Sequence, residues 1–313
     1  MNIFEFLGLP KDHRAESKVT QLVKHYDEVV EKNKAGKRLC VQTKKDGVCS
    51  LVAVYKGKLE IFSRTGKKFT NTHNIKDKLL TMNLGDGIYM GELTCDLASL
   101  EVLSGAVNPN RVNRLSEDLI HIPNNLVINF FDLVSVEAFS YGVATETYEL
   151  RYNELRSRVV SESYRVFILS YVTVDSEEKI RMILNLAVDK GEEGVVIRDL
   201  DAGWVAGHKG YRVMKLVRGV DYDLLCINYE VGTGKYSDKV ANLIFKWKGV
   251  KEIKCMLGKG WTHDMAKDML TNVKSDPPIG KIFQVYALEE SSKGKLRLPK
   301  VGELRHDKVS PDV

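Results

Sequence analysis

Residues 38–63 of this chain are RLCVQTKKDGVCSLVAVYKGKLEIFS. Three runs within this stretch, RLCVQT, SLVAVY and LEIFS, are rich in the β-branched and aromatic residues that favour strands. The pair Lys56-Gly57 separates the last two runs and is typical of a tight turn. The polar loop Lys44-Lys45-Asp46-Gly47 separates the first two. The stretch therefore predicts three successive strands, with the KKDG loop between the first and the second.

The flanking sequence mixes further strands with helices, which predicts an α+β domain over residues 1–218. Helices are expected over 146–161 and from Asp175 or Ser176 to about Asp189. Residues 17–32 have apolar side chains at helical spacing, so an amphipathic helix is expected there as well. The expected buried strands are GIYMGELT (87–94), LVINFFDLV (126–134), VFILSYVTV (166–174) and GVVIRDL (194–200).

The texture changes after Gly219, where short strands alternate with Gly and Lys turns. One helix is expected around 263–274. About five strands with one helix predict an OB-fold β-barrel over residues 219–313. The expected strands are YDLLCINYEV (222–231), ANLIFKWKG (241–249), KEIKCML (251–257) and KIFQVYALEE (281–290).

The composition excludes several classes of protein. Hydrophobic residues make up 43% of the 313 residues and charged residues 28%, without an eighteen-residue apolar run, so no membrane association is expected. The start of the chain lacks the pattern of a secretory signal. Five widely spaced cysteines without a CxxC pair argue against disulfides or zinc and favour a reducing cytoplasm. The net charge of +5 is compatible with nucleic acid without requiring it.

The KKDG loop has a specific chemical capacity. A lysine amine attacks phosphorus only when unprotonated, and its free pKa is about 10.4, so a site would have to lower that pKa through burial or nearby cations. Gly47 would let the backbone approach a phosphate closely. Taken by itself, however, KxDG is equally a polar β-turn with solvated lysines, so it needs context.

Further short motifs supply that context, in order along residues 38–308. They are Ser63-Arg64-Thr65-Gly66, Gly91-Glu92-Leu93, Phe131-Asp132, Glu193-Gly194-Val195, Lys215 and Arg305-His306-Asp307-Lys308. Together with the KKDG loop, the series resembles the nucleotidyltransferase superfamily, which comprises ATP-dependent DNA ligases, RNA ligases and mRNA-capping guanylyltransferases. The resemblance implies a nucleotidyltransferase (adenylation) domain of antiparallel sheets and helices followed by the OB-fold barrel.

The resemblance also assigns roles to residues. Lys44 matches the nucleophile that forms a phosphoramide with AMP. The other matches are Gln42 for the adenine edge, Arg64 for ribose or the incoming 5′-phosphate, Glu92 for the ribose hydroxyl or the metal, Phe131 for stacking on adenine, Glu193 for the metal, Lys215 for the α-phosphate, Lys209 as a basic position that is often Arg, and Arg305 and Lys308 for orienting pyrophosphate. ATP and Mg²⁺ are the implied cofactors.

Structural alternatives stay open for several of these residues. Glu92 could be a strand-edge residue, Phe131 a core residue and Arg305 a surface residue near the terminus, and one of Glu192 and Glu193 is expected to be a solvated helix-end acid. The chain also departs from the family pattern in two places. Cys49 stands where an arginine is common, and the lysine expected two residues after Lys215 is Val217, which leaves the exact phosphate clamp open.

Three functions compete: a DNA ligase, a GTP-dependent capping guanylyltransferase suggested by RHDKVSPD (305–312), and a non-catalytic OB protein. VGTGKYSDKVANLIFKW (231–247) resembles the start of the ligase OB domain, and RLPKVGELRHDK (297–308) resembles the end of compact phage ligases. Because only 43 residues precede Lys44, a large N-terminal DNA-binding domain is not expected. An RNA ligase is a further alternative, although many of those lack an OB domain.

The sequence therefore predicts a minimal two-domain, bacteriophage-like ATP-dependent DNA ligase. Its expected partner is nicked double-stranded DNA. We expect a monomer in a bacterial or phage-infected host cytoplasm.

Overall fold

The computed structural model describes residues 1–159, 164–249, 251–258, 260–287, 290–291 and 294–313. The chain forms two compact units, Met1–Val217 and Arg218–Val313. The sequence had placed the boundary one residue later, after residue 218.

The first sheet of unit 1 contains the strands that the opening stretch predicts. Its order is β4 (Lys58–Ser63), β3 (Val48–Tyr55), β5 (Gly87–Thr94), β6 (Val127–Val134) and β8 (Val166–Ile168). Lys56 and Gly57 turn the β3–β4 hairpin with φ angles of 51° and 72°, the left-handed values that a two-residue hairpin turn needs.

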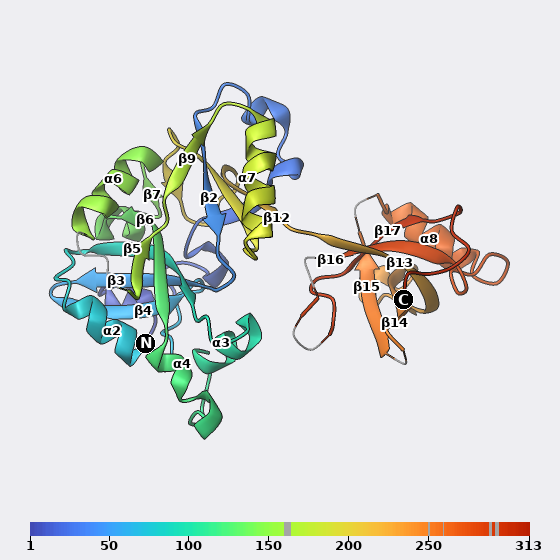
Figure 1. Cartoon of the computed structure of the whole chain (residues 1–313), viewed down its shortest axis with the longest axis horizontal. Helices are drawn as coiled ribbons and strands as arrows, with labels where there is room; N and C mark the ends of the chain where they lie inside the picture. Colours follow the sequence, from blue (N-terminus) through green and yellow to red (C-terminus); the bar gives the residue numbers. More distant parts are fainter. Residues whose placement is uncertain (160–163, 250, 259, 288–289, 292–293) are drawn as a thin grey trace. The chain divides into compact units, whose positions relative to one another are not determined.

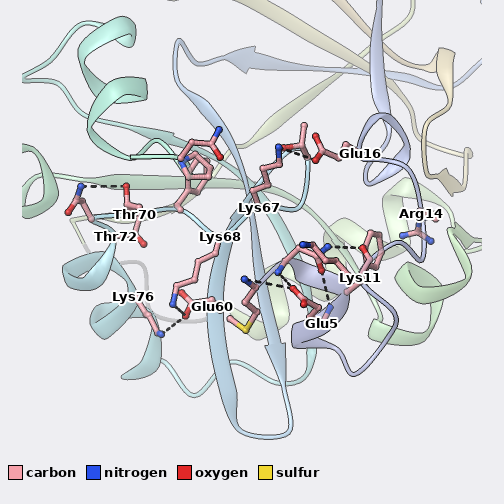
Figure 2. Close-up of a pocket in the computed structure, with 18 of the residues that line it drawn as sticks. Glu5, Lys11, Arg14, Glu16, Glu60, Lys67, Lys68, Thr70, Thr72 and Lys76 are labelled. Atoms are coloured by element: carbon pink, nitrogen blue, oxygen red, sulfur yellow. Dashed lines mark hydrogen bonds and ion pairs between the residues drawn. The ribbon is translucent and has the colours of Figure 1, made fainter. Parts of the chain in front are cut away.

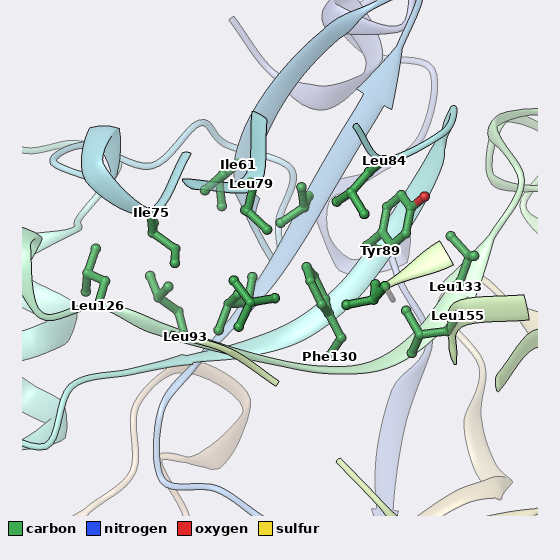
Figure 3. Close-up of a cluster of buried hydrophobic side chains, with 14 of the residues drawn as sticks. Ile61, Ile75, Leu79, Leu84, Tyr89, Leu93, Leu126, Phe130, Leu133 and Leu155 are labelled. Carbon is green, nitrogen blue, oxygen red and sulfur yellow. The ribbon is translucent and has the colours of Figure 1, made fainter. Parts of the chain in front are cut away.

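Both faces of this sheet are buried. Figure 3 shows the core on one face, where Phe130 of β6 lies among side chains such as Leu79 of α2 (His73–Leu80) and Leu155 of α6 (Tyr148–Arg158). On the other face, α1 (Ile3–Phe6) and α5 (Val136–Tyr141) pack with Trp204. The remaining short elements are α3 (Leu100–Ala106), α4 (His121–Asn124), the Glu117–Leu119 turn of 3-10 helix, β7 (Val143–Ala144) and β11 (Trp204–Val205).

The second sheet of unit 1 has the order β1 (Leu22–His25), β12 (Lys209–Val217), β10 (Gly194–Asp199), β2 (Leu39–Lys44) and β9 (Tyr171–Val174). Helix α7 (Glu177–Asp189) covers one face, and Figure 1 shows it beside β2 and β9. The Ser176 side chain accepts the backbone N–H of Lys179 and so provides the predicted cap. Successive side chains of a strand point to opposite faces of the sheet. Every second side chain of β2, β10 and β12 therefore points away from α7, into the interior of unit 1.

The predicted helix over 17–32 is wrong. This segment contains β1 between turns of 3-10 helix at Glu16–Lys18, Tyr26–Glu28 and Glu31–Asn33. Strand β1 pairs in parallel with β12, which supplies the backbone hydrogen bonds that a helix would have made internally. The apolar spacing still marked buried side chains, because Val19, Tyr26 and Val29 all belong to the core.

A second correction concerns VFILSYVTV, which was expected to be one strand. The structure divides it into β8 and β9, which belong to different sheets. Leu169 lies between the two strands, and its carbonyl accepts hydrogen bonds from the side chains of Gln42 and Tyr152. The helix expected over 146–161 ends at Arg158, and residues 160 and 161 fall outside the described residues.

Unit 2 is a closed five-stranded barrel, which confirms the predicted barrel architecture. Its strand order is β13 (Val220–Val231), β14 (Val240–Trp247), β15 (Lys251–Leu257), β17 (Lys300–Leu304) and β16 (Ile282–Ala287). Helix α8 (His263–Thr271) and the Gly234–Tyr236 turn complete it. Strand β17, directly before Arg305, was not predicted. Residues 288 and 289, at the end of the expected strand KIFQVYALEE, lie outside the described residues.

Across the described parts of both units, no helix is long and apolar enough to cross a membrane.

Candidate active site

The register of the second sheet brings three predicted site residues onto one face. Lys44 lies opposite Gly194, and Gln42 lies opposite Val196. On the other side of β10, the same Val196 lies opposite Lys215. Directly opposed residues project to the same face of a sheet. Gln42, Lys44 and Lys215 therefore occupy the face turned away from α7, although Lys215 is 171 residues further along the chain than Lys44.

Two glycines let the strands approach closely at this point. A Cβ on Gly194 would lie 2.3 Å from the carbonyl oxygen of Leu216 in β12. A Cβ on Gly47 would lie 2.6 Å from the carbonyl oxygen of Leu93 and 2.8 Å from Cγ of Glu92. The glycine of the KKDG loop is thus required by its contact with β5. This steric reason differs from the phosphate approach that the sequence suggested.

Each lysine of the KKDG loop forms an ion pair with one of two adjacent acids. The Lys44 ammonium donates to the Glu193 carboxylate at 2.5 Å, and Lys45 pairs with Glu192. The Glu193 side chain is only 10% exposed, and burying a carboxylate is costly unless it is paired, so its place depends on this pair. Glu192 is not a solvated helix-end acid, because it lies beyond the end of α7 and pairs with Lys45.

Charges near Lys44 act on one another. Burial raises the pKa of Glu92 to about 7, while the positive charges of Lys44 and Arg64 oppose that rise and the charge of Glu193 adds to it. Burial and then the charge of Lys44 lower the pKa of Lys215. Such effects need short separations in a poorly solvated setting. Glu92, from the first sheet, therefore lies near the lysine and the acid of the second.

Cys49 takes part in this setting at the position where the family commonly has an arginine. It lies opposite Glu92 across the β3–β5 pair, so the two side chains share a face. Burial, and then the charge of Glu92, raise the pKa of the Cys49 thiol to about 12. Cys49 is thus a neutral group and does not supply the positive charge of the arginine that is common at this position.

A β-bulge directs Phe131. Met90 pairs with Asp132 and Gly91 pairs with Phe130, so Phe131 is the extra residue on β6. A bulge leaves its extra residue unpaired and re-aims the side chain, a device common beside active sites. Phe130 belongs to the core shown in Figure 3, whereas Phe131 contacts the core on the opposite side of the sheet.

Arg198 joins Phe131 to Gln42, and sequence reasoning missed it. Its guanidinium lies 4.8 Å from the centre of the Phe131 ring, and its Nε donates to Oε1 of Gln42 at 2.9 Å. Nε2 of Gln42 donates to the Leu169 carbonyl at 2.8 Å. The Gln42 amide is therefore held in one orientation. The sequence signal was a charged residue, Arg198, directly after the apolar run GVVI (194–197) of a strand that was expected to be buried.

Asp132, quoted with Phe131 in its motif, serves the fold. It receives hydrogen bonds from Nε and Nη2 of Arg151 at 2.9 and 3.0 Å, and both side chains are buried. A bidentate pair of this kind anchors α6 to β6.

Two further predicted residues lie at the margin. Arg64 follows β4 and is exposed, without a hydrogen bond or ion pair among the described residues. Its charge nevertheless opposes the rise in the pKa of Glu92 that burial causes. Lys209 is the exposed first residue of β12, and its charge contributes to the lowered pKa of Lys215.

The acids here fit a loosely held magnesium ion. Within the described ranges, no group of three or more His, Cys, Asp or Glu side chains is arranged as a metal site. Glu92 and Glu193 are two carboxylates close enough that the charge of Glu193 raises the pKa of Glu92. Magnesium is usually held by one or two carboxylates together with substrate phosphates and water, so this pair suffices.

The predicted residues of the terminal motif belong to unit 2. Arg305 pairs with Asp223 at 2.9 Å and with Asp307 at 2.8 Å, and Lys308 pairs with Asp223 at 3.0 Å. These carboxylates raise the pKa of Arg305 and Lys308. Arg305 is therefore fixed by partners and is not a mobile surface residue.

A groove of about 1370 Å³ lies elsewhere on unit 1 (Figure 2). Thr65 lines it, but none of the predicted site residues does. Three of its cations are paired, Lys67 with Glu16, and Lys68 and Lys76 with Glu60, and Lys11 and Arg14 line it as well. The groove therefore lies apart from the residues predicted to bind the nucleotide.

Comparison with known proteins gives one consistent result. The family model "ATP dependent DNA ligase domain" matches residues 18–216, and "DNA ligase OB-like domain" matches residues 231–305. A DNA ligase of Acidianus ambivalens is 24% identical over 270 residues, which cover 79% of this chain and 44% of that protein. The chain spans less than half the length of the curated relatives it matches.

Solved structures share the fold. One named Pmar-Lig_PreS3 superposes with a TM-score of 0.77 at 21% identity and covers 91% of this chain and 67% of that chain. A second, from a study of DNA binding by Lig E DNA ligases, gives a TM-score of 0.67 at 17% identity and covers 91% of this chain and 98% of that chain. None of these matches supports a capping guanylyltransferase or an RNA ligase.

Proposed function

Because this chain belongs to the ATP-dependent DNA ligase family, we propose that it seals nicks in double-stranded DNA through enzyme-AMP and DNA-adenylate intermediates. The observation that carries the proposal is the convergence on Lys44. Strands β2, β10 and β12 of one sheet bring Lys44, Glu193 and Lys215 together, and Glu92 from the other sheet lies near them.

We assign the adenine end of the nucleotide site to Phe131 and Gln42. Phe131 presents its ring for stacking on the base. The Gln42 amide uses one N–H on Leu169 and one acceptor site on Arg198, which leaves a second N–H and a second lone pair for the adenine edge. Because Arg198 fixes the amide, the pocket presents a defined donor and acceptor and favours ATP over GTP.

The phosphate end is formed by Lys44, Lys215 and the two acids. The Lys44 amine attacks the α-phosphorus of ATP, the new N–P bond replaces the bond to the bridging oxygen, and pyrophosphate leaves. Attack requires a neutral amine, and Glu193 is the acceptor placed at its proton. Lys215 neutralises charge on the α-phosphate, where fixed cations are most effective. Glu92 and Glu193 would hold Mg²⁺, which supplies further charge neutralisation when bound.

The remaining predicted residues serve the outer phosphates and DNA. Arg64 binds ribose or the incoming 5′-phosphate, and Lys209 adds positive charge beside Lys215. Arg305 and Lys308 orient pyrophosphate as it leaves. AMP then passes to the 5′-phosphate of the nick, and the 3′-hydroxyl displaces it. A monomer acting in a bacterial or phage-infected cytoplasm remains our expectation.

Labelling decides the proposal. The full chain is incubated with ATP or GTP carrying an α-phosphate label and Mg²⁺, and is then chased with nicked DNA or with nicked RNA. We expect label from ATP, acid-labile as a phosphoramide, and its release together with sealing of nicked DNA. Labelling by GTP alone would place the chain with capping enzymes, and chase by nicked RNA alone would make it an RNA ligase.

A further inference from the structure

We propose that Asp223 is a positioning residue that holds the side chains of Arg305 and Lys308 for the self-adenylation step. The proposal rests on the function proposed above, in which these two cations orient pyrophosphate. It concerns one carboxylate of strand β13, which lies 82 residues before Arg305 in the sequence. No motif in the sequence marked it.

The Asp223 carboxylate receives both cations at once. Nη1 of Arg305 donates to its two oxygens at 2.9 and 3.0 Å, and Nζ of Lys308 lies 3.0 Å from Oδ2. The Asp223 side chain is only 8% exposed. A carboxylate this buried is costly unless it is paired, so its place in the barrel depends on these two partners and theirs on it.

A second carboxylate fixes the plane of the Arg305 guanidinium. Asp307 accepts from Nε at 2.9 Å and from Nη2 at 2.8 Å, which is the parallel fork arrangement. The hydrogen bonds from the Arg305 side chain lower the pKa of Asp307 to about 2. With Asp223 on Nη1 and Asp307 on the other edge, the guanidinium has one orientation instead of many.

The backbone around the motif is fastened to the same residue. The Asp223 backbone N–H donates to Oδ2 of Asp312 at 2.7 Å, and the Asp312 backbone N–H donates to the Asp223 carbonyl at 2.8 Å. The segment from Arg305 to Asp312 therefore begins and ends at one point of β13. Fixing a side chain before the reaction removes the entropy cost of ordering it in the transition state.

Both cations stay accessible while they are held. The Arg305 side chain is 22% exposed and the Lys308 side chain 38%. Arginine has five N–H donors and lysine three, so donors remain for a phosphate. The direction in which the labelling rate changes when Asp223 is neutralised distinguishes two roles for this residue. If Asp223 merely competed with phosphate for the cations, neutralising it would speed the reaction, whereas loss of positioning slows it.

Asp223→Asn in the full chain tests this. Single-turnover labelling is measured over a range of ATP concentrations, and sealing of a pre-adenylated nick is measured separately. We expect the labelling rate constant to fall about 10- to 100-fold, the half-saturating ATP concentration to change less than about twofold, and sealing to change less than about threefold. Asp276→Asn is the matched control, because Asp276 forms an exposed pair with Lys281 in the same unit.

A double-variant test separates positioning from general damage to the barrel. In an Arg305→Ala, Lys308→Ala background, Asp223→Asn should cause no further loss of labelling, because the residues through which it acts are gone. A further loss as large as in the normal background overturns the proposal, as does an Asp223→Asn protein that labels as fast as the normal chain or faster.

If Asp223→Asn does not fold, Asp223→Glu decides. It keeps the charge but moves the carboxylate, so a labelling rate between those of the normal chain and the Arg305→Ala, Lys308→Ala variant is expected, and a normal rate contradicts the proposal. A normal chain that takes no label from ATP contradicts the proposed function itself, which distinguishes the two failures.

Discussion

The two sites with predicted roles differ in how their cations are held. In unit 1, Lys44 and Lys215 are placed by the register of paired strands, and Gly194 makes the close approach possible. In unit 2, Arg305 and Lys308 follow the last strand and are placed by side-chain ion pairs, above all with Asp223. Strand pairing positions a side chain through many backbone hydrogen bonds, whereas an ion-pair cluster positions it through a few side-chain atoms.

Because of this difference, single substitutions in the two units should have different kinds of effect. Replacing a side chain on β2 or β12 leaves the strand in place and removes only the chemistry of that side chain. Replacing Asp223 leaves Arg305 and Lys308 present but without a fixed orientation. The first kind of change should affect the chemistry directly, and the second kind should act through geometry.

The largest effect is expected for Lys44→Ala, which should abolish labelling from ATP because no other amine occupies its position. Lys45→Ala is the matched control, since Lys45 is the neighbouring lysine and has its own acidic partner. Its labelling rate should fall at most about fivefold, because a partly exposed ion pair contributes no more than about 1 kcal/mol. Labelling of each purified variant is measured under identical conditions. An essential Lys45 with a dispensable Lys44 would show that the motif register is wrong.

The next effect concerns unit 1 by itself. A fragment of residues 1–217 keeps three hydrophobic clusters of its own and should fold. Without Arg305 and Lys308 it should self-adenylate about 100-fold more slowly, yet still seal a pre-adenylated nick weakly. It should also bind nicked DNA more weakly and with a smaller salt dependence. A fragment that adenylates as fast as the full chain would leave the barrel a role in DNA binding only.

A smaller effect is expected at the adenine end. Arg198→Met removes the donor that fixes the Gln42 amide, so the preference for ATP over GTP in labelling should fall about tenfold. Arg181→Met on the exposed side of α7 is the control, because the partners of Arg181 among the described residues are the exposed acids Asp27 and Glu177. An unchanged nucleotide preference in Arg198→Met would show that the Gln42 orientation does not determine base choice.

The smallest effect is a pH dependence of stability. Glu92 has a pKa raised to about 7 by burial, so between its unfolded value and pH 7 the folded state binds the proton more tightly. Its favourable contribution is complete at low pH and is lost as the pH rises through 7. The melting temperature of Glu92→Gln minus that of the normal chain should therefore be higher at pH 8.5 than at pH 5, by roughly 2–5 °C.

Glu60→Gln is the control of opposite sign. Burial opposes ionisation of Glu60, but its hydrogen bonds with Lys68 and Lys76 outweigh burial and lower its pKa. The stabilisation from an acid with a lowered pKa is present above the unfolded value and is lost in acid. Glu60→Gln should therefore lower the melting temperature more at neutral pH than in acid. Identical melting differences for Glu92→Gln at both pH values would contradict the raised pKa.

Local sequence patterns predicted most strands, because β-branched runs and turn residues are local signals. GIYMGELT coincides with β5, and KEIKCML coincides with β15. The helix over 17–32 failed because helical spacing of apolar residues also arises when a strand and turns bury side chains in succession. What decided between them was the pairing of β1 with β12, a contact between residues nearly 190 positions apart.

The site was predictable where a residue acts through its own chemistry and not where it acts through a partner. Lys44, Glu92 and Lys215 stood out by motif and spacing, and their roles stay predictions. Arg198 and Asp223 did not, because their importance lies in contacts with Gln42 and with Arg305 that only the fold creates. The ion pair of Lys44 with Glu193 and that of Arg305 with Asp223 were likewise invisible in the sequence.

The missing side chain of Gly47 bears on how such sequences evolve. Because any Cβ there would collide with the backbone of β5, this glycine remains under selection in a descendant that has lost ligation but keeps the fold. Lys44 has no such steric obligation. A homologue with the glycine but without the lysine would therefore be a folded relative that has given up its chemistry, and the two positions of one short motif would record separate histories.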